Sequence, residues 1–298
     1  MPQYFFLIFL IFITFSSQAK ELEADDPLAS PRYTVLKGDS LYNIAQDFDL
    51  GVDELLMANP GLINAESKFL FAGRTIILPI IHLIPDVSRK GIVVNLAELR
   101  LYFFSDNAEP VSFPISIGKD EVTPVGKTKI ISKTKNPSWI PPASILEENP
   151  NLPKIIFPGP DNPLGNYALY LDASKNHKWQ SIMIHGTNAP KSIGSKVSHG
   201  CIRLYPQDIE QLFDSVEIDT PVEFVNQPLK VEEIEGKIYI EIHLREAPDL
   251  VPEKLGVKKL ICRKIADCEQ RIDWQKVDDA VVQNLGIPVL INSYRFSE

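Results

Sequence analysis

The residue best suited to covalent chemistry is Cys201, which lies in the run SHGCIR at residues 198–203. His185 precedes it in the run IHGT, and His199 stands two places before the thiol. A thiol attacks a carbonyl as its thiolate, which a neighbouring imidazolium or oriented backbone amides favour by lowering the thiol pKa. Either histidine could serve as the base, so the pattern predicts Cys-His acyl transfer.

The residues around Cys201 suit the same chemistry. Gly200 leaves the backbone free to point N–H groups at a developing oxyanion, which is the largest contribution in many acyl transfers. If residues 201–204 are extended, Arg203 lies on the same side as Cys201, and its guanidinium could hold a carboxylate. We therefore expect a nucleophile and an anion-binding group side by side.

Two other interpretations use the same residues. His185, His199 and Cys201 could bind zinc with His177 as a fourth ligand, because zinc favours nitrogen and sulfur donors. Their spacing lacks the usual pair of closely spaced metal ligands, so we predict no metal and no cofactor. The purely structural alternative is a buried cysteine beside histidines whose hydrogen bonds are satisfied. Two His-Gly steps near a single cysteine argue against it.

Length and composition limit the class of protein. The chain has 298 residues, 44% of them hydrophobic and 23% charged, which suits about two globular domains. Its net charge of −9 offers no basic surface, so we expect no nucleic-acid partner. The apolar run 4–15 is too short to cross a bilayer, and small residues follow it. We interpret 1–19 as a signal peptide and expect export to the periplasm.

Residues 33–79 form a candidate small module. A short strand at 33–36 is followed by Leu41, Ile44, Ala45 and Phe48, which share one helical face. Val52, Leu55 and Leu56 mark a second helix that ends before Pro60. A strand at 74–79 closes the module, so the expected order is β-α-α-β.

The rest of the chain predicts a mainly β fold. Residues 90–225 alternate β-branched runs with proline and glycine turns, including two strands around a turn near Ala97. A short helix at 206–213 follows the cysteine motif, with a strand at 221–225 after it. Residues 226–298 form a C-terminal extension of mixed character.

The small module resembles a LysM domain. The segments YTVLKGDSLYNIA, DELLMANP and FAGRTIILP carry the pattern of that family across 33–79. LysM domains bind the N-acetylglucosamine chains of peptidoglycan or chitin, so the resemblance implies that this module binds peptidoglycan. It places Gly38, Asp39, Ser40 and Asn59 near the glycan groove.

Residues 90–225 resemble the catalytic domain of the L,D-transpeptidases. The resemblance rests on TPVGKTKI, NPSWIPP, NPLGNYALYL, IHGTNAPKSIG and SHGCIRL. It implies that Cys201 is the nucleophile and His185 its base, oriented by the carbonyl of Gly186. His199 would support the pocket, and Arg203 would hold a substrate carboxylate. Ser198 and Gly200 are assigned to substrate binding with Arg203.

The resemblance also implies a reaction. Such enzymes attack a peptidoglycan tetrapeptide stem, release D-alanine and transfer the stem from the cysteine to an amine. The amine can belong to another stem, giving a 3-3 cross-link, or to a lysine of an outer-membrane lipoprotein. Water in its place would make the protein an L,D-carboxypeptidase, and an inert thiol would leave a non-catalytic peptidoglycan-binding protein.

The three cysteines raise a question of oxidation state. Cys262 and Cys268 could form a local disulfide in an oxidising compartment or remain two buried thiols. Cys201 must stay reduced to act, so we expect a periplasmic thiol reductant as a partner.

Overall fold

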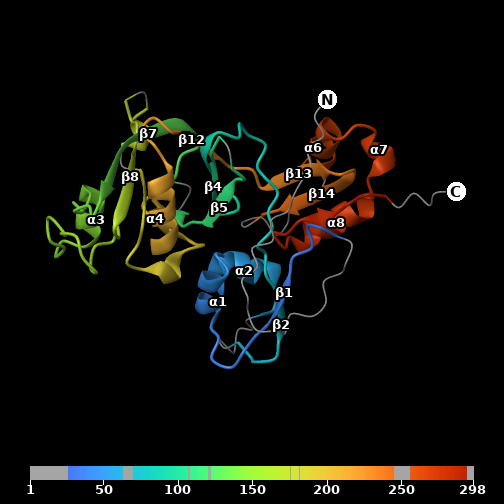
Figure 1. Cartoon of the computed structure of the whole chain (residues 1–298), viewed down its shortest axis with the longest axis horizontal. Coiled ribbons are helices and arrows are strands. Elements are labelled where there is room, and N and C mark those ends of the chain that lie inside the picture. Colours follow the sequence, from blue (N-terminus) through green and yellow to red (C-terminus); the bar gives the residue numbers. More distant parts are fainter. Residues whose placement is uncertain are drawn as a thin grey trace.

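The structure is a computed structural model. It describes residues 26–62, 70–106, 108–119, 122–174, 176–180, 182–244 and 256–293. The predicted signal peptide at 1–19 lies outside the described residues. None of the helices in these ranges is long and apolar enough to cross a membrane. Figure 1 shows three groups of elements, with the small module below the other two.

The small module has the expected β-α-α-β order. Its elements are β1 (Arg32–Thr34), α1 (Leu41–Asp47), α2 (Val52–Ala58) and β2 (Thr75–Ile77). The two strands are antiparallel, with Tyr33 opposite Ile76. Both strands are shorter than predicted.

The helices of the small module begin and pack as their sequences dictate. The Ser40 hydroxyl accepts a hydrogen bond from the Asn43 N–H at 3.1 Å, which caps the first turn of α1. The apolar faces of both helices meet in one core with the strands, which includes Ile44, Leu55 and Ile76.

The middle of the chain forms an eight-stranded sheet. Its spatial order is β11-β9-β8-β7-β12-β3-β4-β5. The strands run as follows: β3 Gly91–Asn95, β4 Arg100–Phe104, β5 Val111–Pro114, β7 Gly126–Lys135, β8 Tyr167–Leu171, β9 Met183–His185, β11 Ile202–Arg203 and β12 Pro221–Val225. The prediction of a mainly β fold is confirmed, as is the turn between β3 and β4.

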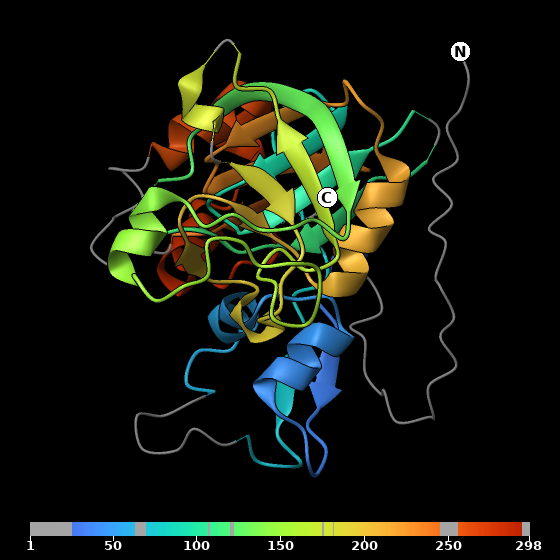
Figure 2. The same ribbon diagram turned by 90° about the vertical axis from the view of Figure 1, so that its left-hand side faces the viewer.

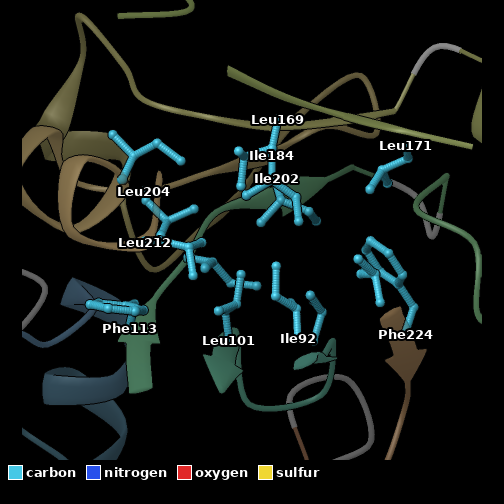
Figure 3. Close-up of a cluster of buried hydrophobic side chains, with 14 of the residues drawn as sticks. Ile92, Leu101, Phe113, Leu169, Leu171, Ile184, Ile202, Leu204, Leu212 and Phe224 are labelled. Atoms are coloured by element: carbon cyan, nitrogen blue, oxygen red, sulfur yellow. The ribbon is translucent and has the colours of Figure 1, made fainter. Parts of the chain in front are cut away.

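The long strand β7 lets the sheet curl over its own core. It pairs with β12 along its first half and with β8 along its second, and Figure 2 shows it arching across the sheet. Leu169, Ile184 and Ile202 on one half of the sheet face Ile92 and Leu101 on the other (Figure 3). The helix α4 (Pro206–Ser215) packs its buried Ile209 and Leu212 into the same core.

Several shorter elements lie outside the eight-stranded sheet. They are β6 Ile117–Gly118 paired with β10 Lys196–Ser198, the helix α3 Ala143–Glu148, and the 3₁₀ turns η1 His177–Trp179 and η2 Pro190–Ser192. The turn η2 lies in the segment 186–197 between the two sequence motifs, and β10 closes that segment.

The C-terminal extension has its own core. A three-stranded sheet is covered by helices, and its elements are β13 Leu229–Ile234, β14 Lys237–Ile242, β15 Val289–Leu290, α6 Val257–Lys264, α7 Cys268–Arg271 and α8 Trp274–Gln283. Cys262 and Cys268 form a disulfide that links α6 to α7. This answers the question that the cysteine count left open.

A buried charge network joins the extension to the eight-stranded sheet. The Lys230 ammonium, 2% exposed as a residue, lies 2.7 Å from a carboxylate oxygen of Glu241 and contacts Glu98. It also donates to the carbonyl of Leu83 at 2.7 Å. A buried cation is tolerated where such partners surround it, so the network fixes the extension against the turn between β3 and β4.

Candidate active site

The two sequence motifs lie on adjacent parallel strands. In the register of β9 and β11, Ile184 is opposite Ile202 and His185 is opposite Arg203. Both isoleucines are fully buried in the core. Because side chains alternate along a strand, His185 and Arg203 share the opposite face. Cys201 directly precedes β11, and the charge of Arg203 acts on both Cys201 and His185. That Arg203 and Cys201 stand on the same side stays a prediction.

His185 is held as a neutral base. Its ring is buried, and Nδ1 lies 2.6 Å from the carbonyl oxygen of Gly186. That contact places the ring proton on Nδ1 and leaves Nε2 with the lone pair. Burial, and then the charge of Arg203, lower the pKa of His185 to about 4. The ring is therefore uncharged at neutral pH and able to accept a proton.

Cys201 rests as a thiol. The structure places it outside any disulfide among the described residues, at partial exposure. Burial raises the pKa of Cys201, although a backbone hydrogen bond from Met183 and the charge of Arg203 both oppose the shift. The expected lowering of this pKa by an imidazolium does not occur, because His185 is itself desolvated and neutral. If this thiol acts as a nucleophile, it has to lose its proton during the attack.

The turn that carries Cys201 is held by hydroxyl groups. Gly200 has a φ of 119°, and a Cβ there would lie 2.7 Å from Cδ1 of Ile182. The Ser198 hydroxyl donates to the Cys201 carbonyl at 2.7 Å and accepts from the Gly200 N–H at 3.0 Å. Ser198 therefore shapes the turn, and a direct contact with substrate stays a prediction.

Thr123 is a positioning residue that the sequence analysis missed. Its buried hydroxyl donates to the Gly200 carbonyl at 2.9 Å and accepts from the Gly118 N–H at 2.9 Å. It thus ties β6 to the nucleophile turn. Only its place in the segment TPVG could have marked it.

Arg203 offers a binding group for an anion. Its backbone is fixed by paired hydrogen bonds with Ser116, at 2.9 and 3.0 Å. Its Nε is buried and has no hydrogen-bond partner among the described residues. Desolvation lowers the pKa of Arg203, and the nearby Cys201 opposes this. A buried guanidinium whose Nε has no hydrogen-bond partner among the described residues suits a substrate carboxylate.

His199 lies in a more exposed environment than His185. Its side chain is 43% exposed, and Nε2 lies 3.2 Å from both carboxylate oxygens of Glu148 at the end of α3. The structure therefore joins His199 to the segment that contains α3 and does not bury it with His185. Its predicted support of the pocket would act through that segment.

The other polar clusters do not overlap this site. Among the described residues, the groups of three possible metal ligands are Cys262, Cys268 and Glu269, and His82, Glu98 and Glu241. The first contains the disulfide, and the Lys230 ammonium already lies between the carboxylates of the second. A zinc set of His177, His185, His199 and Cys201 finds no support in this geometry.

A pocket of about 180 Å³ opens beside the site. Gly186, Thr187 and Asn188 line one side of it, and the segment 159–166 lines the other. The buried Asn162 holds that segment, since its amide donates to the carbonyl of Pro137 at 2.7 Å. The pocket is lined by uncharged groups, so it suits an amide or hydroxyl of a ligand near the base.

The predicted glycan-binding residues lie at the two ends of the small module's helices. The Asp39 carboxylate accepts from the Leu36 N–H at 2.7 Å and the Tyr33 hydroxyl at 2.8 Å, beside Gly38. Asn59 bonds the backbone of Ile77 in both directions, at 2.7 and 2.8 Å. With Ser40 engaged as the cap of α1, these side chains shape the loops, and sugar binding by them stays a prediction.

Comparisons with known proteins agree with this arrangement. The sequence pattern of the YkuD L,D-transpeptidase catalytic domain matches residues 89–224, and that of the LysM domain matches 33–79. The chain is 35% identical over 265 residues to the probable L,D-transpeptidase YbiS of Escherichia coli, covering 83% of this chain and 82% of YbiS. It is 35% identical over 275 residues to the probable L,D-transpeptidase YcfS of the same organism, covering 87% and 82%.

Solved structures give a more distant likeness. The L,D-transpeptidase 1 of Mycobacterium tuberculosis is 24% identical, with a TM-score of 0.32, over 46% of this chain and 62% of that chain. The match thus spans less than two thirds of that solved chain.

The family follows from the sequence relatives. The chain belongs to the L,D-transpeptidases of the YkuD family. It is an enzyme of this class that carries an N-terminal LysM domain. Both resemblances noted from the sequence are confirmed.

Proposed function

We propose that the protein is an exported cysteine L,D-transpeptidase that acts on peptidoglycan stems. The observation that carries the proposal is the pairing of β9 with β11, which sets the neutral imidazole of His185 opposite Arg203. The buried Nε of Arg203 has no hydrogen-bond partner among the described residues, and the charge of Arg203 acts on the thiol of Cys201, which directly precedes β11. These observations support the assignment of nucleophile, base and anion-binding group to Cys201, His185 and Arg203.

In the acylation step, the Cys201 sulfur attacks the carbonyl of the L-centre that precedes the terminal D-alanine. His185 takes the thiol proton on Nε2, and the new imidazolium then protonates the leaving amine. A carbon–sulfur bond forms, and the carbon–nitrogen bond to D-alanine breaks. Backbone N–H groups near Cys201 that are not already bonded would stabilise the oxyanion, since the Gly200 N–H is held by the Ser198 hydroxyl.

In the second step, an amine attacks the thioester. His185 removes its proton, the carbon–nitrogen bond forms, and the thiol is restored. The amine is a second peptidoglycan stem or a lysine of an outer-membrane lipoprotein. The uncharged pocket lined by Gly186 and Thr187 lies beside His185. It suits a peptide amide of the molecule that carries the attacking amine. Water in place of the amine is the outcome that would make the protein a carboxypeptidase.

The modules divide this work. The LysM domain at 33–79 holds peptidoglycan, residues 90–225 catalyse the transfer, and 226–298 form an extension. We place the protein in the periplasm, since the run 1–19 suits a signal peptide and the substrate lies there. A disulfide elsewhere in the chain suits an oxidising compartment. Cys201 would then depend on a thiol reductant.

The test measures D-alanine release from a disaccharide-tetrapeptide. We expect Cys201→Ala to abolish release, and His185→Gln to lower it by roughly a hundredfold or more, since general base catalysis contributes about 10²–10⁴. Adding an amine should yield a transfer product in place of the hydrolysed tripeptide. Undiminished release by Cys201→Ala would overturn the proposal, and a hydrolysed product insensitive to amine would support the carboxypeptidase.

A further inference from the structure

The small module is seated on the segment that joins the two catalytic motifs. The Val52 N–H at the start of α2 donates to the carbonyl of Ile193 at 3.4 Å. The hydroxyl of Tyr205, just before α4, donates to the carbonyl of Leu50 at 3.1 Å. The turn between α1 and α2 therefore touches the catalytic domain both before and after Cys201 in the sequence.

The backbones of the two domains pack closely at this contact. A Cβ on Gly51 would lie 2.6 Å from the Cα of Gly194, and one on Gly194, whose φ is 90°, would lie 2.4 Å from the Cα of Gly51. A side chain at either position would force the two backbones apart. The buried ion pair of Arg100 with Glu54, at 2.9 Å, lies beside this contact. We call this contact between 49–54 and the catalytic domain the seam.

Two carboxyl groups meet in the seam. Asp49 comes from the small module, in the turn before α2, and Asp208 from the first turn of α4. The two side chains lie within hydrogen-bonding reach of each other. Asp49 Oδ1 and Asp208 Oδ2 are buried, and no donor among the described residues is bonded to either oxygen. Two ionised carboxylates cannot share a hydrogen bond, so the pair must hold one proton.

The groups around the pair do not remove the need for that proton. The Arg100 guanidinium donates to the Asp49 carbonyl at 3.1 Å, but Glu54 already balances its charge. His82 also faces Asp49, and burial lowers the pKa of His82, so it adds no full charge at neutral pH.

The surroundings of Asp208 also favour the protonated form of the pair. Tyr205 adjoins the pair as a neutral phenol. Burial, and then Asp49, raise the pKa of Asp208 to about 9, with Arg100 opposing. The proton is therefore retained at pH 7 while the seam is closed.

We propose that Asp49 and Asp208 share one proton across the seam and thereby act as positioning residues, holding the LysM domain against the loop that carries the catalytic motifs. The pair makes closure of the seam a proton-linked event. A docked LysM domain fixes how far a bound glycan lies from Cys201. This effect on catalysis rests on the proposed reaction.

The direction of the pH effect follows from proton linkage. An exposed Asp loses its proton near pH 3.9, whereas the closed seam keeps one. Between about pH 3.9 and the pKa of about 9 in the closed seam, closing the seam therefore takes up one proton. The equilibrium between the open and the closed seam then shifts towards the open form as pH rises. The slope is about tenfold per pH unit across the neutral range. Asp208→Asn replaces the shared proton with a permanent amide donor, so its seam should be independent of pH.

Hydrogen exchange of the full chain measures the seam without any catalysis. We would follow peptides covering 48–56 and 190–196 by mass spectrometry at pH 6, 7 and 8, corrected for the intrinsic exchange rate. Protection in the wild type should fall about tenfold per pH unit. It should stay constant in Asp208→Asn and, as a second variant, in Asp49→Asn.

The controls isolate the pair. Asp214→Asn removes an exposed carboxylate from the same helix and should keep the wild-type slope. Peptides of α6, which packs against β13 and α7, should show no slope in any variant. A wild-type seam with constant corrected protection would overturn the proposal, and so would equal slopes in the wild type and a folded Asp208→Asn or Asp49→Asn.

A second readout connects the seam to function. The ratio of kcat/KM on insoluble peptidoglycan to kcat/KM on the soluble disaccharide-tetrapeptide should fall from pH 6 to 8 in the wild type and stay constant in Asp208→Asn. A purely structural role would change both substrates alike. Failure of the proposed reaction would show as no turnover of either substrate, whereas the exchange data would still test the shared proton.

Discussion

Replacing Thr123 with Val tests whether the hydroxyl network holds the nucleophile in place. The change keeps the shape of the side chain but removes the partner of two buried backbone groups, the N–H of Gly118 and the carbonyl of Gly200. Each group left without a partner costs about 1–3 kcal/mol. For two such groups we therefore expect the free energy of unfolding to fall by about 2–6 kcal/mol. A domain with an ordinary stability of about 5–15 kcal/mol survives most of this range.

The catalytic effect should be larger than the loss of folded protein explains. The Gly200 carbonyl belongs to the turn that carries Cys201, and a misplacement of about 1 Å can lower a rate by about a hundredfold. We expect kcat for D-alanine release to fall at least tenfold at a temperature where the variant is fully folded, as judged by urea titration. Thr123→Ser is the matched control, because it keeps the hydroxyl and should retain near wild-type kcat. Wild-type stability and kcat in Thr123→Val would refute this account of the turn.

Four further predictions concern the site and the extension. The kcat/KM for the soluble substrate should stay level from pH 8 down to about 5 and fall through about pH 4, because the neutral form of His185 is the base and its pKa is lowered to about 4; a fall centred near the ordinary value of about 6.5 would contradict this. The same shift means that stability is lost as pH falls from about 6.5 towards 4, since the unfolded chain binds the proton more readily, and His185→Gln should show a shallower loss in urea titrations at pH 4 to 7. Arg203→Lys should raise KM for a substrate with a free carboxylate by about tenfold or more, because hydrogen bonds to charged groups contribute about 1.5–3 kcal/mol. An equal rise in KM for the same substrate with that carboxylate converted to an amide would argue against carboxylate binding. Reducing the Cys262–Cys268 disulfide, with a sequence separation of 6, should lower the free energy of unfolding by about 2 kcal/mol and leave D-alanine release unchanged; a large loss of activity would mean that the extension shapes the site.

The sequence predicts the chemistry of the site better than its surroundings. Cys201 and Arg203 lie in one short run, so alternation predicts a shared face for them where that run is extended. That His185 lies opposite Arg203 depends on the pairing of β9 with β11, which local spacing does not set. Thr123 and Gly200 are far apart in the chain, and their contact exists only because β6 passes beneath the nucleophile turn. The resting protonation of Cys201 depends on burial, which the local sequence does not set.

The fold shows the same division. The helices of the LysM domain follow from their apolar spacing, and the turn between β3 and β4 from its residue types. The seam could not be predicted, because Asp49 and Asp208 are ordinary acidic residues until two domains bury them together. The charge network of Lys230, Glu98 and Glu241 likewise arises only where the extension meets the sheet. Interactions between modules are long-range, and local patterns carry no signal for them.

The central claim is that Cys201 carries the peptide stem during transfer. Intact-protein mass spectrometry after rapid mixing with the disaccharide-tetrapeptide, followed by peptide mapping, tests it most directly. We predict an adduct with the mass of the substrate minus D-alanine, mapped to Cys201, that disappears when an acceptor amine is added. D-alanine release without an adduct at Cys201, continuing at the wild-type rate in Cys201→Ala, would contradict the account.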